Sequence, residues 1–328
     1  MQKNKLVQVL NTLTAEEIRQ LDKFVRSPVH NKHEAVIQLF QYLRKSLGDE
    51  AKLQKERVFS ALFPGQPFDM QQVHYVSSYL LKVAEEFLAW QEWRKNEGNF
   101  QVSLVRALKG KRLGNYFSQT LEKAMQNMAA LPLRNSDYLH FTYLLEIENY
   151  DASRLSGKAR DFNLQPLADA QEVAYLAEKL KNACVLLSHQ VASKTRYDMG
   201  LLESILALPT DHRYFQVPAT AIYLNAFKAL SNLKDEEAYQ KLKSMLAEHR
   251  QAFQPAELND LYLFALNHII RRVNNGEQHL WREAFDIYRA GLEEGVLLDN
   301  GEIPPRTYSN IVISGLKIKE FEWVERFI

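Results

Sequence analysis

Apolar residues recur at steps of three and four along almost the whole chain, and the alternation typical of strands is nearly absent. This spacing gathers apolar side chains on one face of a helix. The pattern is clearest from 279 to 328, which reads as a helix, a turn, a second helix and the first turns of a third. We therefore predict an all-α fold of roughly 13 or 14 helices, whose ends are marked by capping and breaker residues.

A change in organisation near residue 97 predicts two parts. A helical N-terminal domain is expected over 1–97, where Thr14 and Glu17 form a capping box and Ser27-Pro28 ends the helix that follows. Its helices are predicted over 15–26, 32–47, 53–63 and 70–96. The apolar seam of the last of these is shorter than three heptads, which favours a compact helical domain over a coiled-coil dimer.

From 98 to 328 the pattern becomes a series of helix pairs. They are expected over 100–109 with 111–130, 137–153 with 167–195, 219–231 with 235–251, 256–274 with 277–294, and 305–316 with 319–328. Stacked helix pairs are the unit of an α-solenoid, and solenoids serve mostly as surfaces that bind other macromolecules. We predict an irregular α-solenoid over 98–328.

Two segments near the end carry a more specific resemblance. AFDIYRAGLEEG (284–295) and TYSNIVISGLKIKEFEWVERFI (307–328) resemble tetratricopeptide and pentatricopeptide repeats. The resemblance implies an apolar stripe on the first helix of the last pair, a small residue where the second helix crosses it, and an aromatic residue that opens the second helix. In this chain those residues are Tyr308, Ile311, Ile313 and Leu316 for the stripe, Gly315 for the small residue, and Phe321 for the aromatic one.

Two N-terminal segments carry a second resemblance. FVRSPVHNKHEAVIQLFQYL (24–43) and VFSALFPGQPFDMQQVHYVSSYLLKVAEEFLAWQEW (58–93) resemble the opening of uncharacterised bacterial helical-repeat proteins, which are longer than this chain. That resemblance implies no activity. Neither resemblance assigns a functional role to a residue of this chain.

Composition narrows the classes of protein. The 41 basic and 40 acidic residues give a net charge of +1, which offers no support for a strongly basic nucleic-acid binder. The single cysteine, Cys184, excludes a disulfide within the chain and is read as a small buried hydrophobe. No signal peptide, glycosylation sequon or apolar run of about 18 residues is found, so we expect a cytoplasmic protein without a membrane segment.

No residue set specifies a chemistry. His30 and His33 lie three residues apart without further ligands, and no phosphate-binding, dinucleotide-binding or hydrolase motif occurs. We therefore predict no catalytic residue, no metal site and no cofactor, and interpret the chain as a non-enzymatic scaffold for a protein or peptide. An enzyme with a site assembled from distant residues is a third hypothesis, which a deep pocket with converging ionisable groups would support.

The predicted partner-binding residues are aromatic and amide side chains at similar places in successive helices. They are Tyr223, Asn225, Tyr262, Asn267, Tyr308 and Asn310. Tyrosine side chains often contribute much of the binding energy at protein interfaces, and amide side chains supply hydrogen bonds. For the three tyrosines, packing between helix pairs is an equally weighted alternative.

A basic cluster provides the alternative function, an RNA- or DNA-associated helical-repeat protein. It comprises Arg94, Lys95, Arg106, Lys109, Lys111 and Arg112, followed by the aromatic Tyr116 and Phe117. Cations beside aromatic rings suit phosphate contact and base stacking. Arg154, Lys158, Arg160, Arg271 and Arg272 are further basic residues that an aligned superhelix would add to that face.

The sequence ends within an apolar stripe formed by Phe321, Val324, Phe327 and Ile328. Solenoids carry polar caps at their ends. We therefore expect either that the array is truncated at its C-terminus, or that this apolar edge supports self-association.

Overall fold

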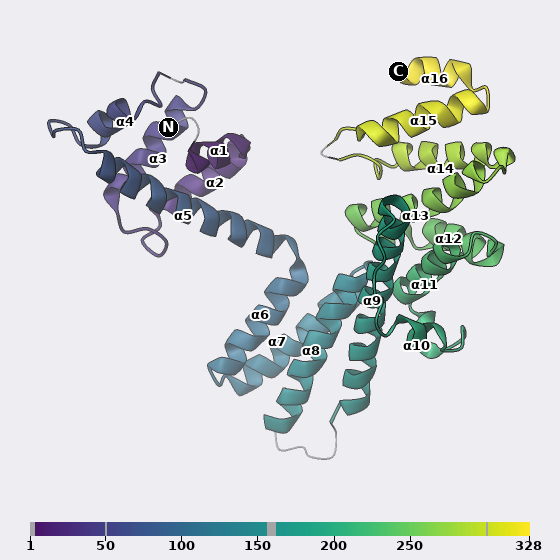
Figure 1. The fold of residues 1–328 in the computed structure, drawn as a ribbon. Helices are drawn as coiled ribbons and strands as arrows, with labels where there is room; N and C mark the ends of the chain where they lie inside the picture. The colour runs from purple at the N-terminus through teal and green to yellow at the C-terminus, as the bar shows by residue number, and fades with distance from the viewer. Residues whose placement is uncertain (1–3, 50, 156–161, 300) are drawn as a thin grey trace. The chain divides into compact units, whose positions relative to one another are not determined.

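The computed structural model describes residues 4–49, 51–155, 162–299 and 301–328. Within those residues the chain forms 16 α-helices and no β-strand, and only one isolated bridge joins Asp299 and Glu302. The prediction of an all-α fold is confirmed (Figure 1). No helix in these ranges combines the length and the apolar character that a bilayer crossing requires.

The chain divides into two compact units, residues 1–100 and 101–328. The sequence-based boundary, between 97 and 98, falls three residues earlier, at the start of α6 (Glu97–Gly110). Unit 1 contains α1 (Lys5–Thr12), α2 (Ala15–Arg26), α3 (Glu34–Ser46), α4 (Lys55–Leu62) and α5 (Met70–Lys95).

Helix α5 is the centre of unit 1, because α1, α2, α3 and α4 all pack against it. Its buried side chains, among them Leu80 and Phe87, meet Leu21 of α2 and Phe40 of α3 in one apolar core. The capping box at the start of α2 is present: the Thr14 hydroxyl accepts from the Glu17 backbone N–H at 3.2 Å, and the Glu17 carboxylate accepts from the Thr14 N–H at 2.7 Å. Helix α1, which the sequence patterns did not predict, is capped by Asn4.

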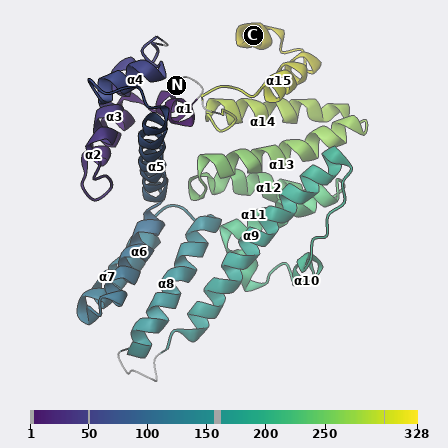
Figure 2. The ribbon, with the colours of Figure 1, turned by 60° about the vertical axis from the view of Figure 1, so that its left-hand side comes forward.

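Unit 2 contains most of α6 and all later helices. They are α7 (Gly114–Ala130), α8 (Ser136–Leu155), α9 (Leu164–Ser193), α10 (Leu202–Leu206), α11 (Pro218–Ser231), α12 (Glu236–Glu248), α13 (Pro255–Asn274), α14 (Trp281–Glu293), α15 (Pro305–Lys317) and α16 (Phe321–Phe327). From α7 onward each long helix packs mainly on the long helices next to it in the chain. Figures 1 and 2 show α13, α14 and α15 following one another in this way.

Helix α11 forms the centre of the larger core of unit 2. Its sequence, PATAIYLNAFKALS, is apolar nearly all round, as expected of a helix covered on several sides. Helices α9, α12 and α13 pack against it. A smaller core, formed by α6, α7 and α8, includes Val105, Leu121 and Leu145.

A buried carboxylate links four segments around α11. Glu257 of α13 accepts hydrogen bonds from the Tyr223 hydroxyl of α11 at 2.6 Å and from the Asn135 amide before α8 at 2.9 Å. Lys181 of α9 lies 3.6 Å from the same carboxylate. Burial, together with the negative charge of Glu257, raises the pKa of Tyr223 far above its ordinary value, so Tyr223 is a neutral donor.

The last helix pair packs closely at Gly315. A Cβ atom at that position would lie 2.5 Å from the Val324 side chain of α16 and 3.2 Å from the Phe285 ring of α14. The crossing expected at Gly315 is therefore found, and Val324 and Ile311 are buried. Ile313 and Leu316 are largely exposed, so the apolar stripe is narrower than the resemblance implied. Phe321 and Ile328 of the apolar edge also face solvent.

Candidate functional site

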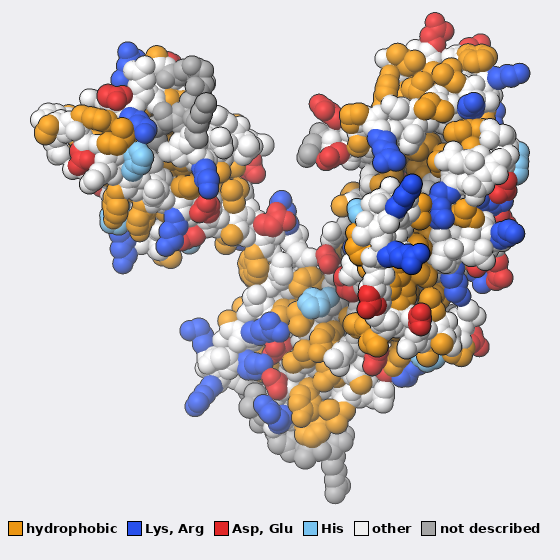
Figure 3. All heavy atoms as spheres, viewed as in Figure 1, with side chains coloured by type: hydrophobic (Ala, Val, Ile, Leu, Met, Phe, Trp, Pro, Cys, Tyr) orange, Lys and Arg blue, Asp and Glu red, His pale blue; other side chains and the backbone are white. Residues whose placement is uncertain are grey.

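A groove of about 730 Å³ opens on unit 2 between α9, α13 and α15, with contributions from α14. We call it the α9–α13–α15 groove. On the visible face of this unit, Figure 3 shows hydrophobic side chains next to Lys and Arg side chains over α9 and α13. All lining residues lie between 187 and 313, within one compact unit.

Helical periodicity explains which side chains line the groove. The lining residues of α13 follow one stripe at three- and four-residue steps: Leu263, Leu266, Asn267, Ile270, Arg271 and Asn274. Those of α15 do the same, at Arg306, Thr307, Asn310 and Ile313. The opposite stripe of α13, which includes Leu261, Ala265 and Ile269, is buried in the core. Burying that stripe fixes the direction in which the groove residues face.

Many of the side chains that line the groove are apolar, and we call these side chains its floor. Leu187, Leu263 and Ile270 contribute to it, while Val191 of α9 and Ile313 of α15 stand at 46% and 44% exposure. Apolar side chains that remain exposed in a concave surface mark a place where a ligand can remove them from water.

Two of the six predicted partner-binding residues line this groove together. Asn267 is exposed on α13, and Asn310 lies on α15. Burial raises the pKa of the Tyr288 hydroxyl in the groove, and the Asn310 side chain opposes that rise. The two amides therefore supply polar groups to a largely apolar groove, one from α13 and one from α15.

The other four predicted residues lie elsewhere. Tyr223 is fully buried on Glu257, and Tyr262 is buried with its hydroxyl donating to Glu294 at 2.8 Å. The Asn225 amide donates to the Ala221 carbonyl at 2.8 Å, and Tyr308 stacks on Phe327 with 5.3 Å between ring centroids. For all three tyrosines the structure shows packing within unit 2, the alternative that the sequence left open.

The groove also contains residues that were not predicted as its members. The sequence pattern assigns Arg271 only to a possible extension of the basic cluster, and it predicts no role for Arg306. Both were accessible to sequence reasoning, since Arg271 is four residues after Asn267 and Arg306 is four residues before Asn310.

Three of the six residues of the predicted basic cluster, Lys95, Arg106 and Lys109, pair with carboxylates. In unit 1, Lys95 pairs with Glu92 at 2.7 Å, and the Arg94 guanidinium lies 5.3 Å from the Trp90 ring centroid. In unit 2, Arg106 pairs with the buried Glu148 at 2.9 Å. Phosphate contact at these residues has to compete with interactions inside the protein, which weakens the basis for a nucleic-acid site.

The remaining residues of the cluster, and the further basic residues that could extend it, are also partly paired and partly exposed. Lys109 pairs with both Glu148 and Asp151. Lys111 and Arg112 are exposed in the turn after α6. Arg272 is held between Glu236 and Glu277, and Lys158 and Arg160 lie outside the described residues. The cations free to meet a phosphate are thus fewer than the sequence suggested.

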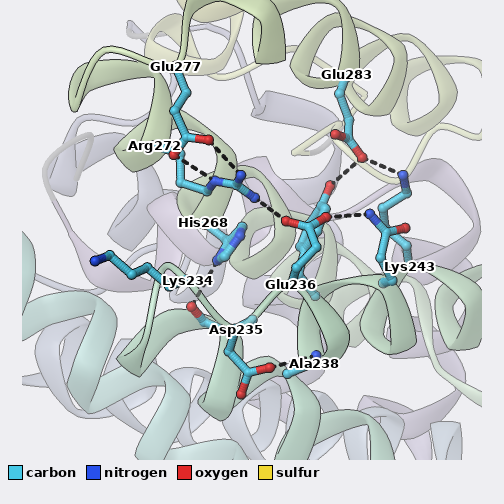
Figure 4. Close-up of polar contacts among 12 residues, drawn as sticks. Lys234, Asp235, Glu236, Ala238, Lys243, His268, Arg272, Glu277 and Glu283 are labelled. Carbon is cyan, nitrogen blue, oxygen red and sulfur yellow. Dashed lines mark hydrogen bonds and ion pairs between the residues drawn. The ribbon is translucent and has the colours of Figure 1, made fainter.

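A polar network joins α12, α13 and α14 on another side of unit 2 (Figure 4). Arg272 bridges Glu236 and Glu277, and Glu283 accepts from the Tyr239 hydroxyl at 2.9 Å and pairs with Lys243. The carboxylates are matched by cations and donors, so the network is suited to holding three helices together. In the described part of the chain no group of His, Cys, Asp and Glu residues has the arrangement of a metal site.

His268 lies at the centre of this network and is fully buried. Its Nδ1–H donates to the Ala229 carbonyl at 2.8 Å, and its ring stacks on Tyr239 with 4.5 Å between centroids. Burial, reinforced by the positive charges of Arg272 and Arg271, lowers the pKa of His268 below its ordinary value of 6.5. The folded protein therefore holds this imidazole neutral.

This arrangement gives a pH-dependent stability. Below about pH 6.5 His268 binds a proton in the unfolded state more readily than in the folded state. The free energy of unfolding therefore falls as the pH is lowered. In His268→Asn the side-chain amide can still donate to Ala229 but does not titrate. Urea unfolding at about pH 7.5 and about pH 5.5 should show a smaller loss of stability in the variant than in the wild type. Equal losses in both proteins would contradict a buried neutral His268.

Cys184 is buried in α9, and its thiol donates to the Tyr223 carbonyl at 3.5 Å. Burial raises the pKa of this thiol far above its ordinary value. Since the thiolate is the reactive form, Cys184 is suited to packing rather than to nucleophilic chemistry.

Comparison of this chain with models of protein families, with curated proteins and with solved structures found no match.

Proposed function

We propose that this protein is a non-enzymatic scaffold that binds a polypeptide partner in the α9–α13–α15 groove. The observation that carries the proposal is an open groove with an apolar floor and amide side chains on its walls. Apolar side chains of a partner would cover the floor, and its backbone would find donors and acceptors in Asn267 and Asn310. The single buried Cys184 fits a reducing compartment such as the cytoplasm.

The proposed architecture is an irregular α-solenoid of tetratricopeptide-like helix pairs. The order in which α11 to α16 pack, each mainly on its neighbours in the chain, supports it. So does the crossing of α15 and α16 at Gly315, where the resemblance implies a small residue. In such an array the first helices of successive pairs lie side by side, and here α13 and α15 supply two walls of one groove.

Peptide binding tests the proposed function. A displayed library of random short peptides is selected on the wild-type protein, and recovered peptides are measured by fluorescence anisotropy against Val191→Gln/Ile313→Gln. Both residues are exposed, so the variant should fold, but its groove loses two apolar contacts. We expect affinity to fall about tenfold to a hundredfold, since covering the exposed half of each side chain contributes roughly half of the ~1.5–3 kcal/mol of full burial.

The same helices offer a matched control. Val185 of α9 and Leu316 of α15 are each 47% exposed but do not line the groove. Val185→Gln/Leu316→Gln should leave peptide affinity unchanged. Recovery of no peptide, or equal weakening by both pairs of substitutions, would count against this groove as the binding site.

A further inference from the structure

The α9–α13–α15 groove has a one-sided charge. Arg271 and Arg306 line it, and no Asp or Glu does so among the described residues. We propose that the groove selects an acidic segment of a partner polypeptide, whose carboxylates pair with Arg271 and Arg306 while neighbouring apolar side chains cover the floor. This inference rests on the proposed function and specifies the chemistry of its ligand.

The position and surroundings of the Arg271 guanidinium favour binding of a carboxylate. One N–H of its guanidinium donates to the Leu230 carbonyl at 2.6 Å, which fixes the side chain in the groove. Burial lowers its pKa, because the charge has lost water without gaining a carboxylate among the described residues. A guanidinium has five N–H donors and matches a carboxylate in a fork-like geometry. An acidic ligand would therefore offset a desolvation cost that the fold leaves uncompensated.

Arg306 supplies a second cation from another helix. It is exposed in the first turn of α15, where no acidic residue stands, and Asn310 follows it by one helical turn. Burial raises the pKa of the Tyr288 hydroxyl, and the Arg306 charge, like the Asn310 side chain, opposes that rise. Arg306, Asn310 and Tyr288 thus form one polar wall, and Arg271 with Asn267 belongs to the wall on α13.

A second groove on the same unit provides an internal comparison. It measures about 840 Å³ and lies between α12 and α14. Its charged residues are balanced, with Lys243, Arg250 and Arg282 beside Glu283, Asp286 and Glu294. Lys243 pairs with Glu283, and Arg250 pairs with Glu294 at 2.8 Å. The unmatched arginines are therefore a property of the α9–α13–α15 groove rather than of the surface of unit 2 in general.

The groove favours an acidic polypeptide over a nucleic acid. Single-stranded nucleic acids need exposed aromatic faces for base stacking as well as a track of cations. Of the two aromatic residues in the groove, Tyr288 is 3% exposed, and the indole N–H of the half-buried Trp281 donates to Gln278 at 3.0 Å. Two cations above an apolar floor suit a short segment that combines Asp or Glu with Leu, Ile or Phe.

The test uses the peptides recovered from the random library. We expect them to be enriched in Asp and Glu next to apolar residues, and to bind more weakly as the salt concentration rises. Arg271→Gln/Arg306→Gln should weaken binding about tenfold to a hundredfold, since charge-assisted hydrogen bonds to carboxylates are lost. Replacing the acidic residues of a recovered peptide by Asn and Gln should remove most of the difference between this variant and the wild type.

Arg282→Gln/Arg289→Gln is the matched control, because it removes two arginines from exposed ion pairs on α14 outside the groove. It should bind as the wild type does. The single variant Arg306→Gln, at an exposed position, repeats the test with minimal risk to folding.

Two outcomes would overturn the acidic selectivity. The first is a set of peptides that lose affinity with Val191→Gln/Ile313→Gln but show no acidic enrichment and no response to Arg271→Gln/Arg306→Gln; the proposed function would then stand without it. The second is groove-dependent binding of a mixed-sequence single-stranded oligonucleotide where no peptide binds, which would overturn both.

Discussion

Glu257→Ala should lower the free energy of unfolding of unit 2 by about 3–5 kcal/mol, which is the range for removing one partner of a buried ion pair. Glu257 is 6% exposed, and its carboxylate accepts from Tyr223 and Asn135 and lies near Lys181. Its removal leaves a buried hydroxyl and a buried amide without an acceptor, together with a partly buried ammonium group. Urea unfolding followed by circular dichroism measures the loss.

Hydrogen exchange shows which part of the chain is destabilised. In Glu257→Ala the amides of α11 and α13 should exchange faster than in the wild type, while those of α2 and α5 should not. Glu293→Ala is the control: its carboxylate pairs with Arg289 on the exposed face of α14, and its removal should change stability by about 0.5 kcal/mol or less. A loss below about 1 kcal/mol for Glu257→Ala would mean that water replaces the carboxylate at little cost.

Phe285→Ala should cost a similar amount, about 3–5 kcal/mol, through loss of apolar burial and a residual cavity. Phe285 of α14 is 1% exposed, and its ring lies edge-on to Trp323 of α16 with 4.9 Å between centroids. The same ring approaches Gly315 of α15. One side chain therefore holds the last three helices together.

The expected signature is local opening of α15 and α16, seen as faster hydrogen exchange and earlier proteolytic cleavage in these helices than in α13. Phe321→Ala provides a matched control, since Phe321 is the same residue type in α16 but 57% exposed. It should alter stability by about 0.5 kcal/mol or less. Equal effects of the two substitutions would contradict the packing described for Phe285.

Capping residues, prolines and apolar periodicity correctly predicted where several helices begin. Pro218, Pro255 and Pro305 begin α11, α13 and α15, within one residue of the starts expected from the apolar periodicity. The capping box at Thr14 and Glu17 is present as predicted. These features depend on backbone geometry within a single turn, so neighbouring residues in the chain are enough to specify them.

Only some of the residues that line the candidate site could be predicted from the sequence. Asn267 and Asn310 were identified, but Tyr223 and Tyr262, chosen by the same criterion, face the core. Recurrence of a residue type in successive helices does not fix its direction, because one residue along a helix turns a side chain by about 100°. Arg106 and Lys109 were expected to be free for phosphate, yet Glu148, about forty residues away, pairs with both.

The sequence by itself determined that this chain is all-α, where many of its helices begin, and which residues share a stripe on each helix. Tertiary structure alone decided which stripe is covered, which cations are paired, and that Arg271 and Arg306 line one groove to which no described Asp or Glu contributes. The physical reason is the range of the interactions. Helix formation and capping act over a few residues, whereas burial and ion pairing depend on which distant helix packs on each face.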